Sequence, residues 1–135
     1  MSLRIRQIVV AVHDLATTVA HFEQVLGIRV CYRDPLVETF GLENALMPIG
    51  DQFLEVVSPI RADTAAGRHL DRHGDSGYML ILQTDDLARA EARLERERVR
   101  IVWRAAYPDI RSVHLHHAAL PRHSHELLRA TPRPL

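Results

Sequence analysis

The sequence predicts an α+β fold of two βαβββ modules, related by a pseudo-twofold axis and forming a curled mixed sheet around a concave cavity. The first observation is a buried strand, an aspartate cap and an amphipathic helix in order from Gln7 to Gly27. The second is the return of this order at Met79–Arg98. A stretch that recurs in this way indicates that one half of the chain is a copy of the other.

The composition is that of a single globular domain over residues 1–135. Hydrophobic residues make up 47% and charged residues 25% of the chain, which is an ordinary globular mixture. The 17 Lys and Arg residues balance the 17 Asp and Glu residues, so no net charge favours nucleic acid or an acidic membrane surface. A single cysteine excludes an internal disulfide and suits a reducing compartment, which predicts a cytoplasmic protein.

The first module is expected over residues 5–60. Ile5–Val12 is rich in β-branched residues and predicts a strand buried on both faces. Asp14 is placed to cap the following helix, and Gly27 is placed to end it in a left-handed conformation. Three further strands are expected at residues 28–33, 39–47 and 52–58.

The connector and the second module follow. Residues 61–77 are polar and predict a connector with a short helix around Gly67–His73. The second module is expected over residues 78–131, with Asp85 or Asp86 capping its helix. Its strands are predicted at 78–84, 99–104, 111–118 and 123–130.

The duplication extends to the last strand. Gln7 and Met79 are 72 positions apart (79 − 7), and Glu55 and Glu126 are 71 apart (126 − 55). A deletion of one residue at the end of the second helix accounts for the difference. Because equivalent residues of the two modules would face each other, we expect these four residues to converge on the cavity.

Four stretches carry a resemblance to known proteins: QIVVAVHDL, MPIGDQFLEVVSP, GRHLDRHGDSGYMLILQTDDL and HLHHAALPRHSHELL. The chain resembles the vicinal oxygen chelate superfamily of glyoxalases, bleomycin-resistance proteins and dioxygenases. Within it, the chain is most similar to methylmalonyl-CoA epimerase-like and glyoxalase-like proteins. The resemblance implies a homodimer that acts as an isomerase or lyase on a small oxygen-rich or thioester substrate, through an enolate-like intermediate.

The resemblance also implies a divalent metal, namely Mn, Mg, Co or Zn. Gln7, Glu55 and Glu126 are the predicted ligands, and Glu55 and Glu126 are the predicted catalytic residues. Gln7 and Met79 stand where the resemblance implies histidines, so the ligand set would consist of oxygen and would suit hard cations better than zinc. Without a cation, two such carboxylates would share a proton and could act as acid and base.

Five residues are predicted to contact substrate: Tyr78, Met79, His114, His116 and Asn44. His114 and His116 lie two apart on a strand and so share one face. If that face is the concave one, they grip substrate or replace missing ligands; otherwise they are surface residues. Asn44 falls where the resemblance implies a glutamate base.

A second class of function stays open, which is a metal-free protein that sequesters a small aromatic or antibiotic-like ligand. The replaced histidines favour this binding protein, and the two glutamates in register across the repeat favour an enzyme. The sequence therefore leaves undecided whether the protein is an enzyme. Tyr32 and Trp103 are expected to pack in the core.

Overall fold

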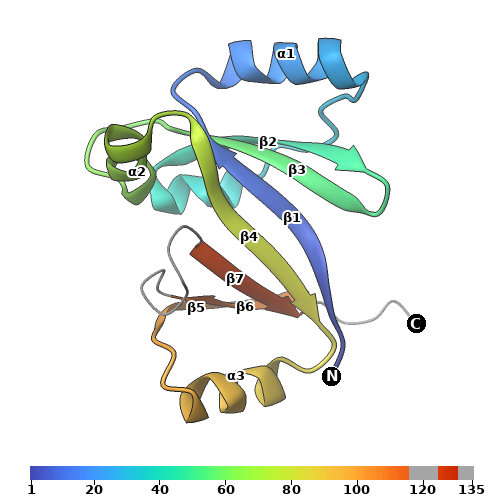
Figure 1. Cartoon of the computed structure of the whole chain (residues 1–135), viewed down its shortest axis with the longest axis vertical. Helices are drawn as coiled ribbons and strands as arrows, with labels where there is room; N and C mark the ends of the chain where they lie inside the picture. Colours follow the sequence, from blue (N-terminus) through green and yellow to red (C-terminus); the bar gives the residue numbers. More distant parts are fainter. Residues whose placement is uncertain (116–124, 131–135) are drawn as a thin grey trace. The chain divides into compact units, whose positions relative to one another are not determined.

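A computed structural model of the chain describes residues 1–115 and, for the backbone, residues 125–130 (Figure 1). Two compact units form: an N-terminal unit, Gln7–Tyr78, and a C-terminal unit, Met1–Arg6 with Met79–Leu135. Both contain helices and a mixed sheet, which confirms the predicted α+β class.

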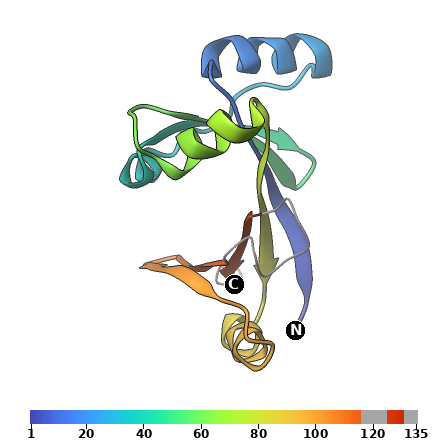
Figure 2. The ribbon, with the colours of Figure 1, turned by 60° about the vertical axis from the view of Figure 1, so that its left-hand side comes forward.

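The N-terminal unit holds a three-stranded sheet in the order β2-β3-β1. Strand β1 runs parallel to β3, and β2 runs antiparallel to β3. Figure 2 shows α1 set apart on one side of this sheet. The elements are β1 Leu3–Ala11, α1 Leu15–Leu26, the 3₁₀ helix η1 Pro35–Phe40, β2 Leu42–Ile49, β3 Gln52–Pro59 and α2 Ala65–His73.

Helix α1 begins and ends where the sequence predicts. The Asp14 carboxylate accepts the Thr17 backbone N–H at 2.9 Å, and this bond holds the pKa of Asp14 below its usual value. Gly27 has φ 66° and donates its N–H to the carbonyl of Glu23. The left-handed conformation has little cost for glycine and satisfies one of the last carbonyl groups of the helix.

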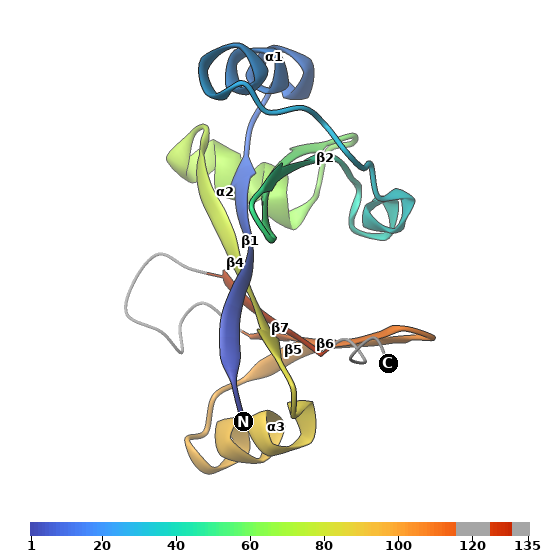
Figure 3. The same cartoon turned by 90° about the vertical axis from the view of Figure 1, so that its right-hand side faces the viewer.

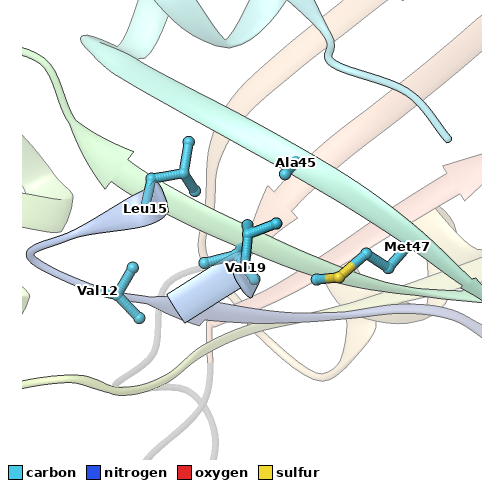
Figure 4. Packing of buried hydrophobic residues seen from close by; sticks show 6 residues of the cluster. Val12, Leu15, Val19, Ala45 and Met47 are labelled. Carbon is cyan, nitrogen blue, oxygen red and sulfur yellow. The ribbon is translucent and has the colours of Figure 1, made fainter. Parts of the chain in front are cut away.

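The core of the N-terminal unit lies between α1 and the sheet. Figure 4 shows its side chains, which alternate along β2 and β3 with residues on the other face. Burial of each larger aliphatic side chain stabilises the fold by about 1.5–3 kcal/mol. The cluster consists of Val12, Leu15, Val19, Ala45, Met47 and Val56. The sheet face opposite the long helix of a unit is called its inner face below.

Two predictions for this unit are wrong. Residues 28–33 do not form a strand, because pairing with β2 is limited to an isolated bridge between Tyr32 and Leu46. The chain then turns into η1, which the sequence analysis missed. Strand β1 is not buried on both faces, since Ile5 and Ile8 are exposed.

The C-terminal unit repeats the plan in the sheet order β4-β7-β6-β5 (Figure 3). Strands β4 and β7 are parallel, and the other pairs are antiparallel. Asp86 is the N-cap of α3 and accepts the Arg89 N–H at 2.9 Å. The elements are β4 Ser76–Thr84, α3 Leu87–Arg96, β5 Ile101–Tyr107, β6 Ile110–Leu115 and β7 His125–Ala130.

Helix α3 covers an apolar cluster of its own. Among the described side chains, its buried members are Leu87, Ala90, Val113 and Leu115. The first residues of the chain also belong to this unit, where the Ser2 backbone N–H and hydroxyl both donate to the Asp85 carboxylate. In the part of the chain that the structure describes, no helix has the length and apolar character needed to cross a membrane.

Candidate functional site

Three buried polar side chains meet on the inner face of the N-terminal sheet. Gln7 comes from β1, Asn44 from β2 and Glu55 from β3, and their exposed fractions are 3%, 3% and 6%. Asn44 and Glu55 alternate with Ala45 and Val56, which pack toward α1, so their side chains point to the opposite face. A carboxylate is rarely buried to this degree without partners.

Both oxygens of Glu55 accept a hydrogen bond from a side-chain amide. Gln7 Nε2 donates to Oε2 at 3.0 Å, and Asn44 Nδ2 donates to Oε1 at 2.9 Å. An ionised carboxylate only accepts hydrogen bonds, so two N–H donors match the charged form. Charge-assisted bonds of this kind are stronger than neutral ones, so the two donors favour the charged form of Glu55.

A backbone group fixes the orientation of Asn44. The Asp34 N–H donates to Asn44 Oδ1 at 2.8 Å, and Arg33 Nη1 donates to the Asn44 carbonyl at 3.3 Å. Because a backbone N–H cannot accept, the amide oxygen must face Asp34 and the amide nitrogen must face Glu55. Asn44 is thus held by partners within the protein, and its predicted contact with substrate stays a prediction.

The start of η1 is thereby tied to the buried cluster. Asp34 also caps η1 by accepting the Leu36 N–H at 2.9 Å, and Pro35 occupies the first turn. An Asp-Pro pair is a recognisable helix start, so the sequence held a signal for η1. No signal of this kind reports the contact between Asp34 and Asn44, which are 10 residues apart.

Tyr78, also predicted to contact substrate, packs against α2. Its ring meets that of His69 edge-on at 5.1 Å between centroids, and burial raises its pKa. Ser76 Oγ donates to the Gly74 carbonyl, so His69 Nε2 is the donor in its 2.9 Å bond to Ser76 Oγ. Burial and the neighbouring His73 lower the pKa of His69.

In the C-terminal unit, Met79 and His114 lie on the inner face. His114 alternates along β6 with Val113 and Leu115, which pack against α3. On β4, Leu82 packs against the cluster under α3. Met79 lies three residues earlier on the same strand, so its side chain points to the opposite, inner face. These two predicted residues therefore share one sheet face.

Two predicted residues are described in part or not at all. Glu126 lies on β7, and its backbone pairs with that of Leu80 on β4. The side chain of Glu126 lies outside the described part of the chain. His116 also lies outside the described residues. The convergence of Glu126 with Glu55, and the catalytic and metal-binding roles of Glu126, stay predictions.

Tyr32 and Trp103 are not core residues, which corrects the sequence-based expectation. Their exposed fractions are 55% and 46%. Trp103 lies on β5, the outermost strand of its unit in the sheet order, where no further strand covers it. It is paired with His114, so both side chains project from the inner face.

The amides around Glu55 turn their nitrogen atoms, not their oxygen atoms, toward the carboxylate, and the metal-binding roles of Gln7 and Glu55 stay predictions. Gln7 presents its amide nitrogen to the carboxylate, and an amide N–H is not a metal ligand. The oxygen of Asn44 is bonded to Asp34 and points away from Glu55. Among the residues that the structure describes, no three His, Cys, Asp or Glu side chains are grouped so that they could hold a metal ion. We therefore derive no chemistry through a metal at this site.

Comparison with known proteins agrees with this architecture. The glyoxalase-like domain family matches residues 8–131. The chain belongs to this family, and hence to the vicinal oxygen chelate superfamily that the sequence resembles. No curated protein sequence matches the chain.

Solved structures of methylmalonyl-CoA epimerases are similar over nearly the full length. A Streptomyces coelicolor variant in complex with 2-nitronate-propionyl-CoA is 25% identical, with a TM-score of 0.86 over 98% of this chain and 97% of that one. An epimerase bound to methylmalonyl-CoA and ammonium gives the same values. The Mycobacterium tuberculosis epimerase is 18% identical, with a TM-score of 0.83 over 95% of this chain and 87% of that one, and shows likeness of fold alone.

Proposed function

We propose that the protein is an isomerase that moves the proton next to the carbonyl group of a small acyl thioester. The observation that carries the proposal is Glu55, a buried carboxyl group whose two oxygens accept hydrogen bonds from Gln7 and Asn44 on the inner face. It is the single buried charged side chain among the residues described up to position 115. Similarity to epimerases in complex with CoA thioesters supports the substrate class.

In the proposed reaction, Glu55 accepts the proton from the α-carbon. The electron pair of the broken C–H bond forms a C=C bond, and the thioester oxygen takes up the negative charge. A proton from water on the other face of the enolate regenerates the thioester with inverted configuration, and Glu55 returns its own proton to water. Donors near the thioester oxygen would stabilise the enolate.

Glu43 is a less suitable base than Glu55, although it lies next to Asn44 on β2. Its side chain is exposed, where water competes for any hydrogen bond to substrate. Glu55 is instead fixed by two donors, which removes the cost of orienting it during the reaction.

The test is hydrogen exchange at the α-carbon. The protein is incubated with methylmalonyl-CoA or propionyl-CoA in D₂O, and deuterium incorporation is followed by mass spectrometry. We expect incorporation by the native protein and a loss of about 100-fold or more in Glu55→Gln. Glu38→Gln, an exposed change in η1 of the same unit, is the matched control and should retain full exchange. Equal exchange by Glu55→Gln and the native protein would contradict the proposed role.

A specific observation favours a second candidate, metal-free binding of a planar ligand. Trp103 and Tyr107 are 46% and 41% exposed on a strand whose Trp103 shares the inner face with His114. Exposed aromatic side chains offer stacking surface to flat ligands. Since Trp103 is the single tryptophan of the chain, quenching of its fluorescence by a ligand would report binding directly. Binding without α-proton exchange would favour this candidate over the isomerase.

The homodimer and the cytoplasmic location remain predictions. Neither is needed for the proposed chemistry at Glu55. Sedimentation of the purified protein at several concentrations would measure its association state, and a constant monomer mass across them would contradict the dimer.

A further inference from the structure

We infer that the side-chain amides of Gln7 and Asn44 take the place of a divalent cation at Glu55, so that this buried charge is held without metal. The inference goes beyond the proposed function, since it concerns how the carboxylate is stabilised whether or not it transfers a proton. It rests on the two N–H···O bonds of 3.0 Å and 2.9 Å.

The first step of the argument is electrostatic. A buried carboxylate needs positive charge, or the positive ends of dipoles, close to its oxygens. An amide N–H directs the positive end of its dipole at the acceptor, and here one such group faces each oxygen. A cation bound to the same oxygens would lie beside these N–H groups, and like partial charges would repel it. The amides and a cation are therefore alternatives.

The second step concerns whether the amides could turn to offer oxygen instead. Asn44 could not do so at small cost, because its Oδ1 accepts the Asp34 N–H at 2.8 Å. If the side chain flipped, the NH₂ group of Asn44 would face the Asp34 N–H, and two donors would then oppose each other. Asn44 is only 3% exposed, so water could not relieve this contact. Such an arrangement would leave the backbone group without its acceptor. The backbone at the start of η1 therefore holds the Asn44 amide so that its nitrogen, not its oxygen, faces Glu55.

The third step is that the local polar network is complete. Among the described residues, no buried side-chain nitrogen or oxygen lacks a hydrogen-bond partner. A site prepared for a metal would present oxygen or nitrogen lone pairs toward a common point. Here the two described side chains that contact the Glu55 oxygens, Gln7 and Asn44, present hydrogen atoms.

The experiment compares the native full-length protein with Asn44→Asp. Aspartate keeps an oxygen to accept the Asp34 N–H and replaces the donor nitrogen by a second carboxylate oxygen facing Glu55. Two facing carboxylates repel each other and attract a cation. We expect chelator treatment and added Mn²⁺, Mg²⁺, Co²⁺ or Zn²⁺ to change the Tm of the native protein by less than about 1 °C. Asn44→Asp should have a lower Tm that Mn²⁺ or Mg²⁺ raises by about 5 °C or more.

Asn44→Leu is the matched control, since it removes the same donor but adds no ligand. Its Tm should not respond to these cations. If Asn44→Asp does not fold, Gln7→Glu applies the same test from the other side of the carboxylate. Native protein purified with one equivalent of metal, and destabilised by its removal, would overturn the inference.

Measurement of α-proton exchange separates this inference from the proposed function. Exchange that persists in chelator-treated protein supports both. An absence of exchange under all conditions, together with an unchanged Tm in chelator, contradicts the isomerase and supports the metal-free site. Exchange that appears only after metal is added, and that Gln7→Leu abolishes, overturns the inference while the isomerase stands.

Discussion

The two units carry the same helix start but different inner faces. Asp14 and Asp86 each accept a backbone N–H three residues ahead, so the same capping geometry occurs twice. The inner face of the N-terminal unit buries the Gln7–Glu55–Asn44 cluster, whereas Trp103 is exposed on that of the C-terminal unit. The difference teaches that the same capped helix can stand over sheets whose inner faces carry different side chains.

The largest expected effect separates the two inner faces. Asn44→Leu removes a donor from buried Glu55 and an acceptor from Asp34, and should lower the free energy of unfolding by about 3 kcal/mol. Met79→Leu on the other inner face keeps volume and polarity and should cost less than about 1.5 kcal/mol. Urea unfolding measures both. Equal losses in the free energy of unfolding would mean that the polar cluster stabilises the fold no more than Met79 does.

The cores under the two helices should respond alike. Val56 and Val113 are the fully buried valines that belong to the α1 and α3 clusters. Truncation of either to alanine should destabilise by about 2 kcal/mol through lost burial and the cavity left behind. Thermal unfolding with a van't Hoff analysis gives the two values. A loss several times smaller at Val113 would show that the C-terminal core is loosely packed.

The ends of the two helices should respond in opposite directions. Gly27 has φ 66° with open space around its α-carbon, so Gly27→Ala should destabilise by about 1 kcal/mol through backbone strain alone. Arg98 adopts φ 56° at the corresponding end of the second module. Arg98→Gly should therefore be neutral or stabilise by up to about 1 kcal/mol. Chemical denaturation of both variants checks the signs, and destabilisation by Arg98→Gly would contradict the explanation.

The smallest expected effect is a pH dependence confined to the N-terminal unit. Burial, and then the charge of His73, lower the pKa of His69 below 6.5. The unfolded chain therefore binds a proton at higher pH than the folded one, so this contribution to stability is complete above pH 6.5 and is lost as pH falls through the folded pKa. His69→Gln should flatten the loss of stability between neutral and mildly acidic pH, and the exposed His21→Gln should not. Denaturation curves across this range measure both.

Much of the fold follows from local sequence. The caps at Asp14 and Asp86 and the glycine at position 27 are confirmed because each depends on neighbouring residues. The prediction of a strand at residues 28–33 is wrong. A strand there would need several paired residues on β2, and the pairing is limited to the bridge between Tyr32 and Leu46. Apolar character alone does not decide pairing length.

For the candidate site too, the sequence determined one part and the tertiary structure another. The sequence by itself identified Gln7, Asn44 and Glu55 as polar residues on predicted strands, and the family through its motifs. Only the tertiary structure decided that the amides donate to the carboxylate and that Asp34 orients Asn44. Whether an amide presents nitrogen or oxygen depends on groups brought close by folding from distant positions, and residue type alone does not specify that choice.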